Sequence, residues 1–411
     1  MRLLLVVALG LTCATARAQA LSLEEALRAA DLHSPRLAAQ RHALSAAEQQ
    51  GARAGELPDP KLRLGIENLP ITGPDRYRYG MDPQTAGVIG LAQEFPNEAK
   101  REARALRAQR LREFETAGLH ASRAALHRDV AAAWLELHFA ERGREALERL
   151  AQRIALQSEA VPAAIARGRQ GSADAFMLRQ VLEEVNDRLI EQERAMAKAR
   201  IALATWVGDE AKRPLGAPPD TASAPQPAEA LLAQLTEQPQ LRVLERKEAL
   251  ARAEVDMARS ERRSDWMLDV AYGQRRPYFD NMLTVMVSVD LPLRREQRQD
   301  RDVASRLAEV EQARAMREDA RRMREAEVRG WLVDFETAAR RVGRFEGVLL
   351  PLARERAAAA QAGYRSGRAE LASVLEAERS IAENELALVQ VMAERAKAWA
   401  NLAYLLAGEV P

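Results

Sequence analysis

The chain has 411 residues, of which 61 are Lys or Arg, 60 are Asp or Glu and 4% are aromatic. This near balance of charge argues against a nucleic-acid-binding protein, which would carry a basic face or tail. The single cysteine excludes a fold held together by internal disulfides, and the composition, rich in Ala, Leu, Glu and Arg, is typical of long helices.

The N-terminal segment has the pattern of a secretory signal peptide. Arg2 precedes an uncharged stretch at residues 3–16, and the small-residue sequence A-R-A at 16–18 suits cleavage. The apolar run is shorter than the roughly 18 to 20 residues that a membrane-spanning helix needs. We therefore predict that residues 1–18 are a cleaved leader and that the chain is exported. Lipidation of Cys13 is the less favoured interpretation, because Cys13 lies inside the apolar run.

The remaining chain consists of two similar halves. Residues 47–62 resemble residues 253–268, and Gln93-Glu94-Phe95-Pro96 corresponds to Val289-Asp290-Leu291-Pro292. The pattern predicts a first structural repeat, a Pro-rich linker and a second structural repeat at residues 19–213, 214–227 and 228–411.

Each half is predicted to contain a helix, two strands separated by a loop, a very long helix, a tight turn and a return helix. In the first long helix, apolar positions recur in alternating steps of four and three from Leu119 to Ile165, as in a coiled coil. Such a helix would span roughly 105 Å at 1.5 Å per residue. The predicted strands are 61–68, 86–95, 265–273 and 283–291, the long helices are about 98–168 and 293–364, and the return helices are about 172–207 and 368–407.

The strands alternate apolar and polar residues over about nine positions, as transmembrane β-strands do. Soluble hairpins packed on a core would show similar alternation. The predicted lipid-facing residues are Leu62, Leu64, Ile66, Trp266, Leu268, Val270, Val285, Val287 and Val289, and the predicted lumen-facing residues are Arg63, Glu67, Asp269 and Asp290. An interfacial aromatic girdle would comprise Tyr77, Tyr79, Tyr278 and Phe279. Four strands cannot close a barrel, for which about eight are needed, so other copies must cover the sheet edges; three copies would supply twelve strands.

This layout of duplicated halves, with two strands and two helices each, resembles the TolC-like outer-membrane factors over nearly all of the mature chain. Three short strings, at residues 57–62, at 67–70, and at 93–96 with Lys100-Arg101, resemble the heavy-metal efflux branch of the CzcC and CusC type. The resemblance implies a homotrimer with a twelve-stranded β-barrel in the cell outer membrane, continued by a periplasmic α-helical barrel. It also implies a periplasmic adaptor (membrane fusion) protein and an inner-membrane RND pump as partners. The acylatable N-terminal cysteine of some relatives is missing, so attachment would rest on the barrel.

The turns between the long helices and their return helices are the predicted functional sites. By resemblance they form the periplasmic tip, which contacts the adaptor or closes the duct. Gly171 and Gly367 suit positions of positive φ. Asp174 and Glu370 could form a cation-attracting ring at a constriction, or they could simply stabilise helix N-termini. The predicted tip residues are Arg167, Arg169, Gly171, Asp174, Tyr364, Gly367, Arg368 and Glu370.

The sequence predicts no enzyme, no cofactor and no metal site, since the five histidines are scattered. The leading hypothesis is the outer-membrane channel component of a tripartite efflux system that passively conducts heavy-metal cations. One alternative is the same duct serving drug efflux or type I protein secretion. A less favoured alternative is a periplasmic coiled-coil scaffold or adaptor without a barrel.

Overall fold

The computed structural model describes residues 20–166, 172–277 and 279–405. Contacts within the chain divide it into two compact units, each of which combines segments from both sequence halves. Unit 1 comprises residues 1–35, 123–234 and 325–411, and unit 2 comprises residues 36–122 and 235–324. The two sequence halves are therefore interleaved within each unit.

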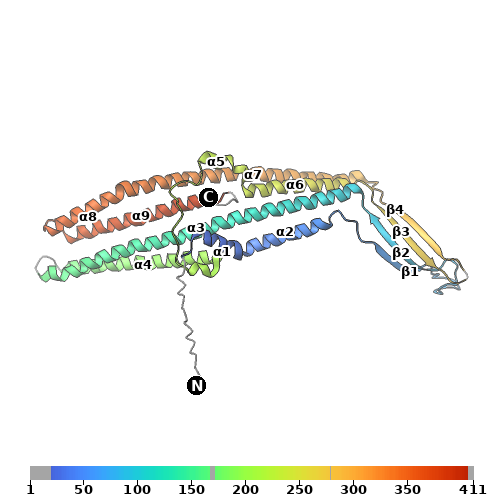
Figure 1. The fold of residues 1–411 in the computed structure, drawn as a ribbon, viewed down its shortest axis with the longest axis horizontal. Helices are drawn as coiled ribbons and strands as arrows, with labels where there is room; N and C mark the ends of the chain where they lie inside the picture. Colours follow the sequence, from blue (N-terminus) through green and yellow to red (C-terminus); the bar gives the residue numbers. More distant parts are fainter. Residues whose placement is uncertain (1–19, 167–171, 278, 406–411) are drawn as a thin grey trace, which may run out of the picture. The chain divides into compact units, whose positions relative to one another are not determined.

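Unit 2 contains one antiparallel sheet of four strands in the order β1-β2-β3-β4 (Figure 1). The strands are β1 (Lys61–Glu67), β2 (Ala86–Phe95), β3 (Trp266–Gln274) and β4 (Met282–Val289). The two central strands, β2 and β3, come from opposite sequence halves. The first and last strands are consequently the two edges of the sheet.

The helices of unit 2 lead into and out of this sheet. The helix α2 (Pro35–Arg53) precedes β1 and α6 (Pro239–Ser260) precedes β3, while α3 (Glu98–Ala166) follows β2 and α7 (Gln299–Arg344) follows β4. Among the described helices, none combines the length and the apolar content that crossing a bilayer requires.

The two long helices begin differently because their first residues differ in capping ability. Asn97, directly after Pro96, accepts the backbone N–H of Lys100 through its side chain at 2.9 Å, and α3 starts at once. The corresponding residue after Pro292 is Leu293, which cannot cap a helix. There the chain first forms a short 3-10 turn (η3, Arg295–Gln297), and α7 begins at Gln299 rather than near residue 293.

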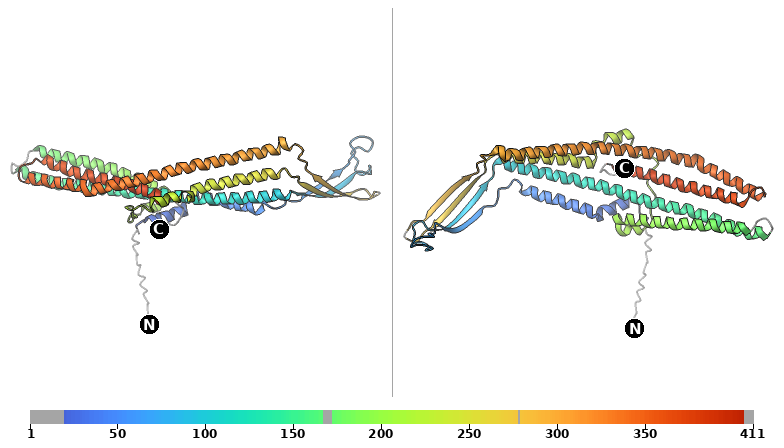
Figure 2. Two further views of the ribbon diagram at one scale, coloured as in Figure 1. Left: turned by 90° about the horizontal axis from the view of Figure 1, so that it is seen from above. Right: turned by 180° about the vertical axis from the view of Figure 1, so that it is seen from behind.

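Unit 1 is built from long helices that pack along the predicted coiled-coil positions. It holds the continuation of α3 with α4 (Ser172–Val207), and α8 (Leu350–Arg365) with α9 (Leu371–Ala403), as Figure 2 shows for each antiparallel pair. Several apolar positions of the predicted α3 repeat are buried, namely Leu126, Val130, Ala133, Leu137, Leu147 and Ile154, whereas Arg123 of the same repeat is exposed. Short elements of this unit are α1 (Leu23–His33), the 3-10 helix η1 (Gly208–Lys212) and α5 (Ala228–Ala233); another 3-10 turn, η2 (Leu235–Glu237), starts unit 2's second segment.

A single π-helical turn joins α7 to α8. This turn, η4 (Phe345–Leu349), has the Leu350 N–H bonded to the carbonyl of Phe345, and Pro351 follows in the first turn of α8. Proline has no N–H and its ring displaces the carbonyl four residues earlier, so a widened turn relieves the conflict. The helical path thus continues past Pro351 to Arg365.

The first helix of the described chain is anchored to unit 1 at its N-terminus. Ser22 and Glu25 form a reciprocal capping box. The Leu21 carbonyl accepts the indole N–H of the fully buried Trp134 at 3.1 Å and the backbone N–H of Gly216 at 2.9 Å. These bonds tie the start of the first half to the linker that follows it.

Candidate functional site on the sheet and at the helix junction

One face of the sheet is apolar across all four strands. Residues directly opposite one another in antiparallel strands share a face, and the register aligns Leu62 with Leu91, Leu91 with Val270, and Val270 with Val285. The next paired residues on the same face are aligned in the same way, as Leu64 with Ile89 and Leu268 with Val287. The register thereby places on one face all nine predicted lipid-facing residues, which are Leu62, Leu64, Ile66, Trp266, Leu268, Val270, Val285, Val287 and Val289.

This apolar face is uncovered in the single chain. Leu64 is 67% exposed and Val287 is 59% exposed, and most other large side chains of the face are exposed as well. Monomeric soluble proteins rarely leave so continuous an apolar surface in water. The face therefore requires another environment or partner.

The opposite face carries small and polar residues. Arg63 lies 3.3 Å from Glu67 and 3.5 Å from Asp269, so the charges on this face are paired across β1 and β3. Asp269 itself is only 6% exposed. Asp290, just beyond β4, continues the alternation, and its backbone N–H donates to the carbonyl of Asp265 at 3.0 Å.

The small residues of this second face let β2 and β3 approach each other closely. A Cβ added at Gly90 would lie 2.9 Å from the Cβ of its partner Ala271. Ala86, Val88 and Ala271 form a buried cluster on the same side. Small side chains on the polar face and bulky side chains on the apolar face favour a sheet that curves toward the polar face.

Aromatic residues lie at both ends of the apolar face. At the helix end, Phe95 and Trp266 stack with ring centroids 4.2 Å apart. At the loop end, Tyr77 and Phe279 are exposed, each beneath a neighbouring arginine, and the Tyr79 hydroxyl accepts the N–H of Gly87 at 3.0 Å. Tyr278 lies outside the described residues.

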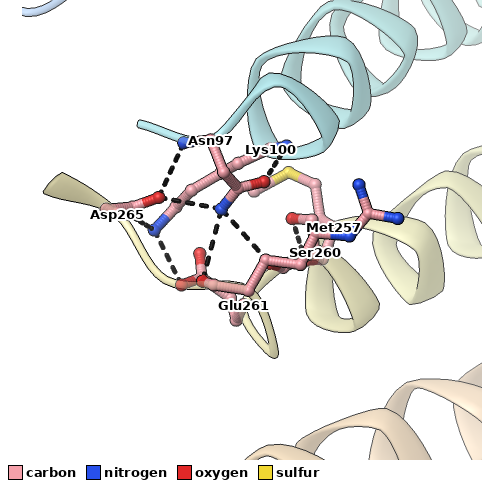
Figure 3. Close-up of polar contacts among 7 residues, drawn as sticks. Asn97, Lys100, Met257, Ser260, Glu261 and Asp265 are labelled. Carbon is pink, nitrogen blue, oxygen red and sulfur yellow. Dashed lines mark hydrogen bonds and ion pairs between the residues drawn. The ribbon is translucent and has the colours of Figure 1, made fainter. Parts of the chain in front are cut away.

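A polar network joins the sheet to the helices where β2 runs into α3 and α6 runs into β3 (Figure 3). The Asn97 backbone N–H and side-chain amide both donate to Oδ1 of Asp265 at 2.8 Å. The same amide donates to the carbonyls of Ser260 and Arg263 at 3.5 and 3.3 Å. Asn97 thus caps α3 and holds the end of α6 at once.

Lys100 completes the junction. Its Nζ donates to Oε2 of Glu261 at 2.7 Å and to Oδ2 of Asp265 at 2.8 Å. Burial opposes the charge on both Lys100 and Asp265, but it is outweighed by their mutual hydrogen bond together with the bond from Lys100 to Glu261 and the bonds from Asn97 to Asp265. As a result the pKa of Lys100 is raised and the pKa of Asp265 is lowered. Both groups are therefore ionised across the neutral range.

The second helix turn has the geometry predicted for its glycine. Gly367 has φ +71°, and the N–H groups of Gly367 and Arg368 donate to the carbonyls of Tyr364 and Gly363 at 3.0 and 2.8 Å. This pair of bonds is the Schellman pattern that ends a helix on a left-handed residue. The corresponding residues of the first turn, Arg167, Arg169 and Gly171, lie outside the described residues.

The remaining predicted tip residues differ in their surroundings. Tyr364 is half-buried and packs against an apolar cluster that includes Leu178 and Leu371. Arg368 and Glu370 are exposed, and Asp174 lies half-buried in the first turn of α4. Tyr364 thus has a packing role, whereas Arg368 and Glu370 face solvent.

No three His, Cys, Asp or Glu side chains are grouped to hold a metal ion in the part of the chain that the structure describes. The junction network was not predicted from the sequence, because Lys100 and Asp265 are 165 residues apart. The available signal was local: Asn97 stands between a proline and a helical pattern, where a capping residue is expected.

Comparison with known proteins gives a consistent answer on the fold. No protein-family model and no curated protein matches the sequence. Among solved structures, the outer membrane protein VceC from Vibrio cholerae is 18% identical, with a TM-score of 0.76 over 95% of this chain and 97% of that chain. The chain has the TolC-like fold of outer-membrane channels.

Two further structures carry the same fold. CusC, studied for folding and transmembrane channel formation, is 14% identical, with a TM-score of 0.76 over 94% of this chain and 90% of that chain. The CmeC outer membrane channel of Campylobacter jejuni is 13% identical, with a TM-score of 0.78 over 93% and 85%. The similarity of these scores does not single out the CusC type.

Proposed function

We propose that the chain is the outer-membrane channel component of a tripartite efflux system, and that it is a passive duct rather than an enzyme. The observation that supports this function most strongly is the exposed apolar face that runs through all four strands of the sheet. Lipid is an environment that such a face fits, and the TolC-like fold is shared with proteins described as outer-membrane channels.

Several copies of the chain close the barrel in this proposal. The described residues place no further strand on the outer edges of β1 and β4, and open edges in lipid would leave backbone groups unsatisfied. Three copies supply twelve strands, with the apolar faces outward and with Arg63, Glu67, Asp269 and Asp290 toward the lumen. The proposed protein is therefore an exported homotrimer that lies in the outer membrane and extends its long helices into the periplasm.

The cargo we propose is heavy-metal cations, delivered by an inner-membrane RND pump through a periplasmic adaptor. The support is the resemblance of residues 57–62, of 67–70, and of 93–96 with Lys100-Arg101 to the heavy-metal branch. A strain lacking the protein should become sensitive to metal salts. Sensitivity confined to organic toxicants, or a defect in protein secretion, would instead favour the alternative cargoes.

The turn residues are proposed to form the periplasmic tip, with Gly367 shaping the second turn and with Arg167, Arg169, Gly171, Tyr364 and Arg368 holding the tip or contacting the adaptor. Asp174 and Glu370, repeated by symmetry, would make an acidic ring that attracts cations. Replacing both acids with Asn and Gln should weaken the block of single-channel current by divalent cations. Unchanged block would reject the ring.

A pair of neighbouring substitutions in β4 tests the membrane assignment. Val287 lies on the apolar face and Ser288 on the opposite face, and both are exposed. Val287→Asp should reduce assembly in the outer membrane, because a charged side chain on the lipid face is destabilising. The cost is roughly 2–4 kcal/mol for a basic residue at the bilayer midplane and less for a carboxylate. Ser288→Asp should assemble normally, because its side chain points to water.

The readout is the amount of protein recovered in the outer-membrane fraction after export. Equal assembly of the two variants, or loss of only the Ser288→Asp protein, would contradict the proposed orientation. Release of the unaltered chain into the soluble periplasm as a monomer would favour a scaffold or adaptor without a barrel.

A further inference from the structure

The α6–β3 arm, which comprises α6 and the residues that lead into β3, is connected to α3 by two acidic residues. Glu254 accepts Arg107 of α3 at 3.1 Å, and Asp265 accepts Lys100 of α3 at 2.8 Å. These contacts lie beside the paired strands β2 and β3. The central pairing of β2 with β3 is thus accompanied by ion pairs between α3, which follows β2, and the segment of α6 and its following residues that leads into β3.

The first half of the chain has the same two acids in the equivalent arm. In the alignment of residues 47–62 with 253–268, Glu48 corresponds to Glu254 and Asp59 to Asp265. The preceding alanines, Ala47 and Ala253, are both 2% exposed, so the two helices present the same face to their neighbours. Yet Glu48 and Asp59 are exposed, and neither has an ion pair among the described residues.

Within the described part of the chain, neither acid is paired, although bases lie nearby. Glu254 also binds Arg306 of its own repeat at 2.9 Å, whereas Glu48 forms no such pair, and Arg104 and Arg107 line the same pocket as Asp59 without forming an ion pair with it. The partner that α3 provides to Glu254 and Asp265 must therefore be sought elsewhere for Glu48 and Asp59. By the repeat, the partner of the α2–β1 arm is the segment that follows β4, but β1 and β4 are opposite edges of the sheet. Three inter-strand spacings of about 4.8 Å separate the strands by roughly 14 Å, well beyond the reach of an ion pair.

The segment after β4 carries an unpaired basic cluster. Its arginines are exposed, and none has an ion pair with the part of the chain that the structure describes: Arg294, Arg295, Arg298 and Arg301. When Pro96 is aligned with Pro292, Lys100 corresponds to Glu296, an acidic residue. The arginines that flank Glu296 would therefore supply the positive charge. Acids on one edge and bases on the other are complementary between copies in a head-to-tail ring.

We propose that Glu48 and Asp59 of one copy bind this arginine cluster of the next copy, forming an intersubunit clasp at the junction of sheet and helices. The clasp repeats between chains the ion pairs that Glu254 and Asp265 make within a chain. It rests on the proposed function, because it requires the copies that close the barrel.

The strand register between copies follows from the same repeat. Phe95 faces Trp266 within the chain, so Leu291 of one copy would face Pro60 of the next, and Val287 would face Leu64. This register keeps the two apolar faces continuous and brings Asp59 beside the arginine cluster. A register shifted by one residue would oppose apolar to polar faces.

Cysteine pairs can test the strand contact and the clasp separately in a Cys13→Ser background. The strand pair is Leu64→Cys with Val287→Cys, and the clasp pairs combine Asp59→Cys with Arg294→Cys, Arg295→Cys or Arg298→Cys. After mild oxidation of outer membranes, the strand pair and at least one clasp pair should give a ladder of disulfide-linked dimer and trimer. Each single-cysteine variant is a control that should give no trimer.

The two proposals fail in distinguishable ways. A trimer ladder from the strand pair but from none of the clasp pairs would overturn the clasp and leave the duct standing. No ladder from any pair, with the protein in the soluble fraction, would overturn both.

Charge reversal tests whether the contact is electrostatic. Replacing Glu48 and Asp59 together with Arg should lower by several degrees the temperature at which the trimer dissociates in detergent. Changing Arg294, Arg295 and Arg298 to Glu in the same chain should restore that temperature. Glu193→Arg, at an exposed acid of α4, is the matched control and should leave it unchanged; an equal effect of this control would contradict the clasp.

Discussion

At the scale of single residues, Gly90 decides how closely β2 and β3 can approach. We predict that Gly90→Ala lowers the melting temperature of the assembled protein, because the new Cβ would lie 2.9 Å from that of Ala271 and the central pair would have to separate. Gly65→Ala is the control, since a Cβ there meets nothing within 4 Å in the chain. Heat-dependent migration on a detergent gel measures the difference, and equal melting of the two variants would contradict the close approach.

Lys100 is the residue on which the junction network depends. Lys100→Met should destabilise the protein by roughly 1–3 kcal/mol, because Glu261 and Asp265 would lose a charged donor in a partly buried site. Lys212→Met is the control, since the Lys212–Asp209 pair is almost fully exposed and should contribute nothing measurable. Thermal unfolding of both variants provides the comparison. An equal loss of stability in the two variants would contradict the proposed contribution of the Lys100 ion pairs.

The same ion pair predicts the pH dependence of the junction. The lowered pKa of Asp265 gives stability that is present above its ordinary pKa and is lost as the pH falls through its folded-state pKa. The raised pKa of Lys100 gives stability that is present below its ordinary pKa and is lost as the pH rises through its folded-state pKa. Asp265→Asn should therefore cost most near neutral pH and progressively less in acid; a constant cost down to pH about 3 would contradict this account.

At the scale of elements, the sequence could predict what depends on neighbouring residues. Alternation from Leu283 to Leu291 is local, and the strand there is Met282–Val289. The fully buried positions of α3 likewise follow its own periodicity. The stacking of Phe95 on Trp266 and the ion pair between Lys100 and Asp265 depend on which distant strands pair. The periodicity of the sequence carries no information on that pairing.

The start of α7 shows why a shared repeat is an incomplete guide. The two halves align across Pro96 and Pro292, but the capping residue Asn97 has Leu293 as its counterpart. The second long helix therefore begins only at Gln299. One side chain thus leaves an arginine-rich segment outside the helix, where it is available to a partner.

The anchoring of α1 gives a prediction for an element. Trp134→Ala should destabilise unit 1 by roughly 3–5 kcal/mol, since it removes a fully buried ring and the donor to Leu21. The equivalent Trp331 is only half-buried, so Trp331→Ala should cost less. Limited proteolysis of the N-terminal segment should accelerate mainly in the first variant; equal acceleration in both would contradict the anchoring role.

At the scale of the whole molecule, the single chain is an incomplete structure. Its sheet exposes an apolar face and two strand edges. At the β1 edge, Glu48 and Asp59 form no ion pair within the described chain, and after β4 the same holds for Arg294, Arg295 and Arg298. In the proposed assembly, each of these features is satisfied by another copy of the same chain or by lipid. The near-neutral composition is consistent with this arrangement, because the proposed contact would place acidic and basic surfaces on complementary sides.

The most direct test of the proposed trimeric duct is the mass of the protein extracted from outer membranes in detergent, measured by native mass spectrometry. We expect one complex of three mature chains, each shortened by its leader. A single chain released without detergent, or an extracted species containing one chain only, would contradict the claim that copies of the four-stranded sheet together form the duct.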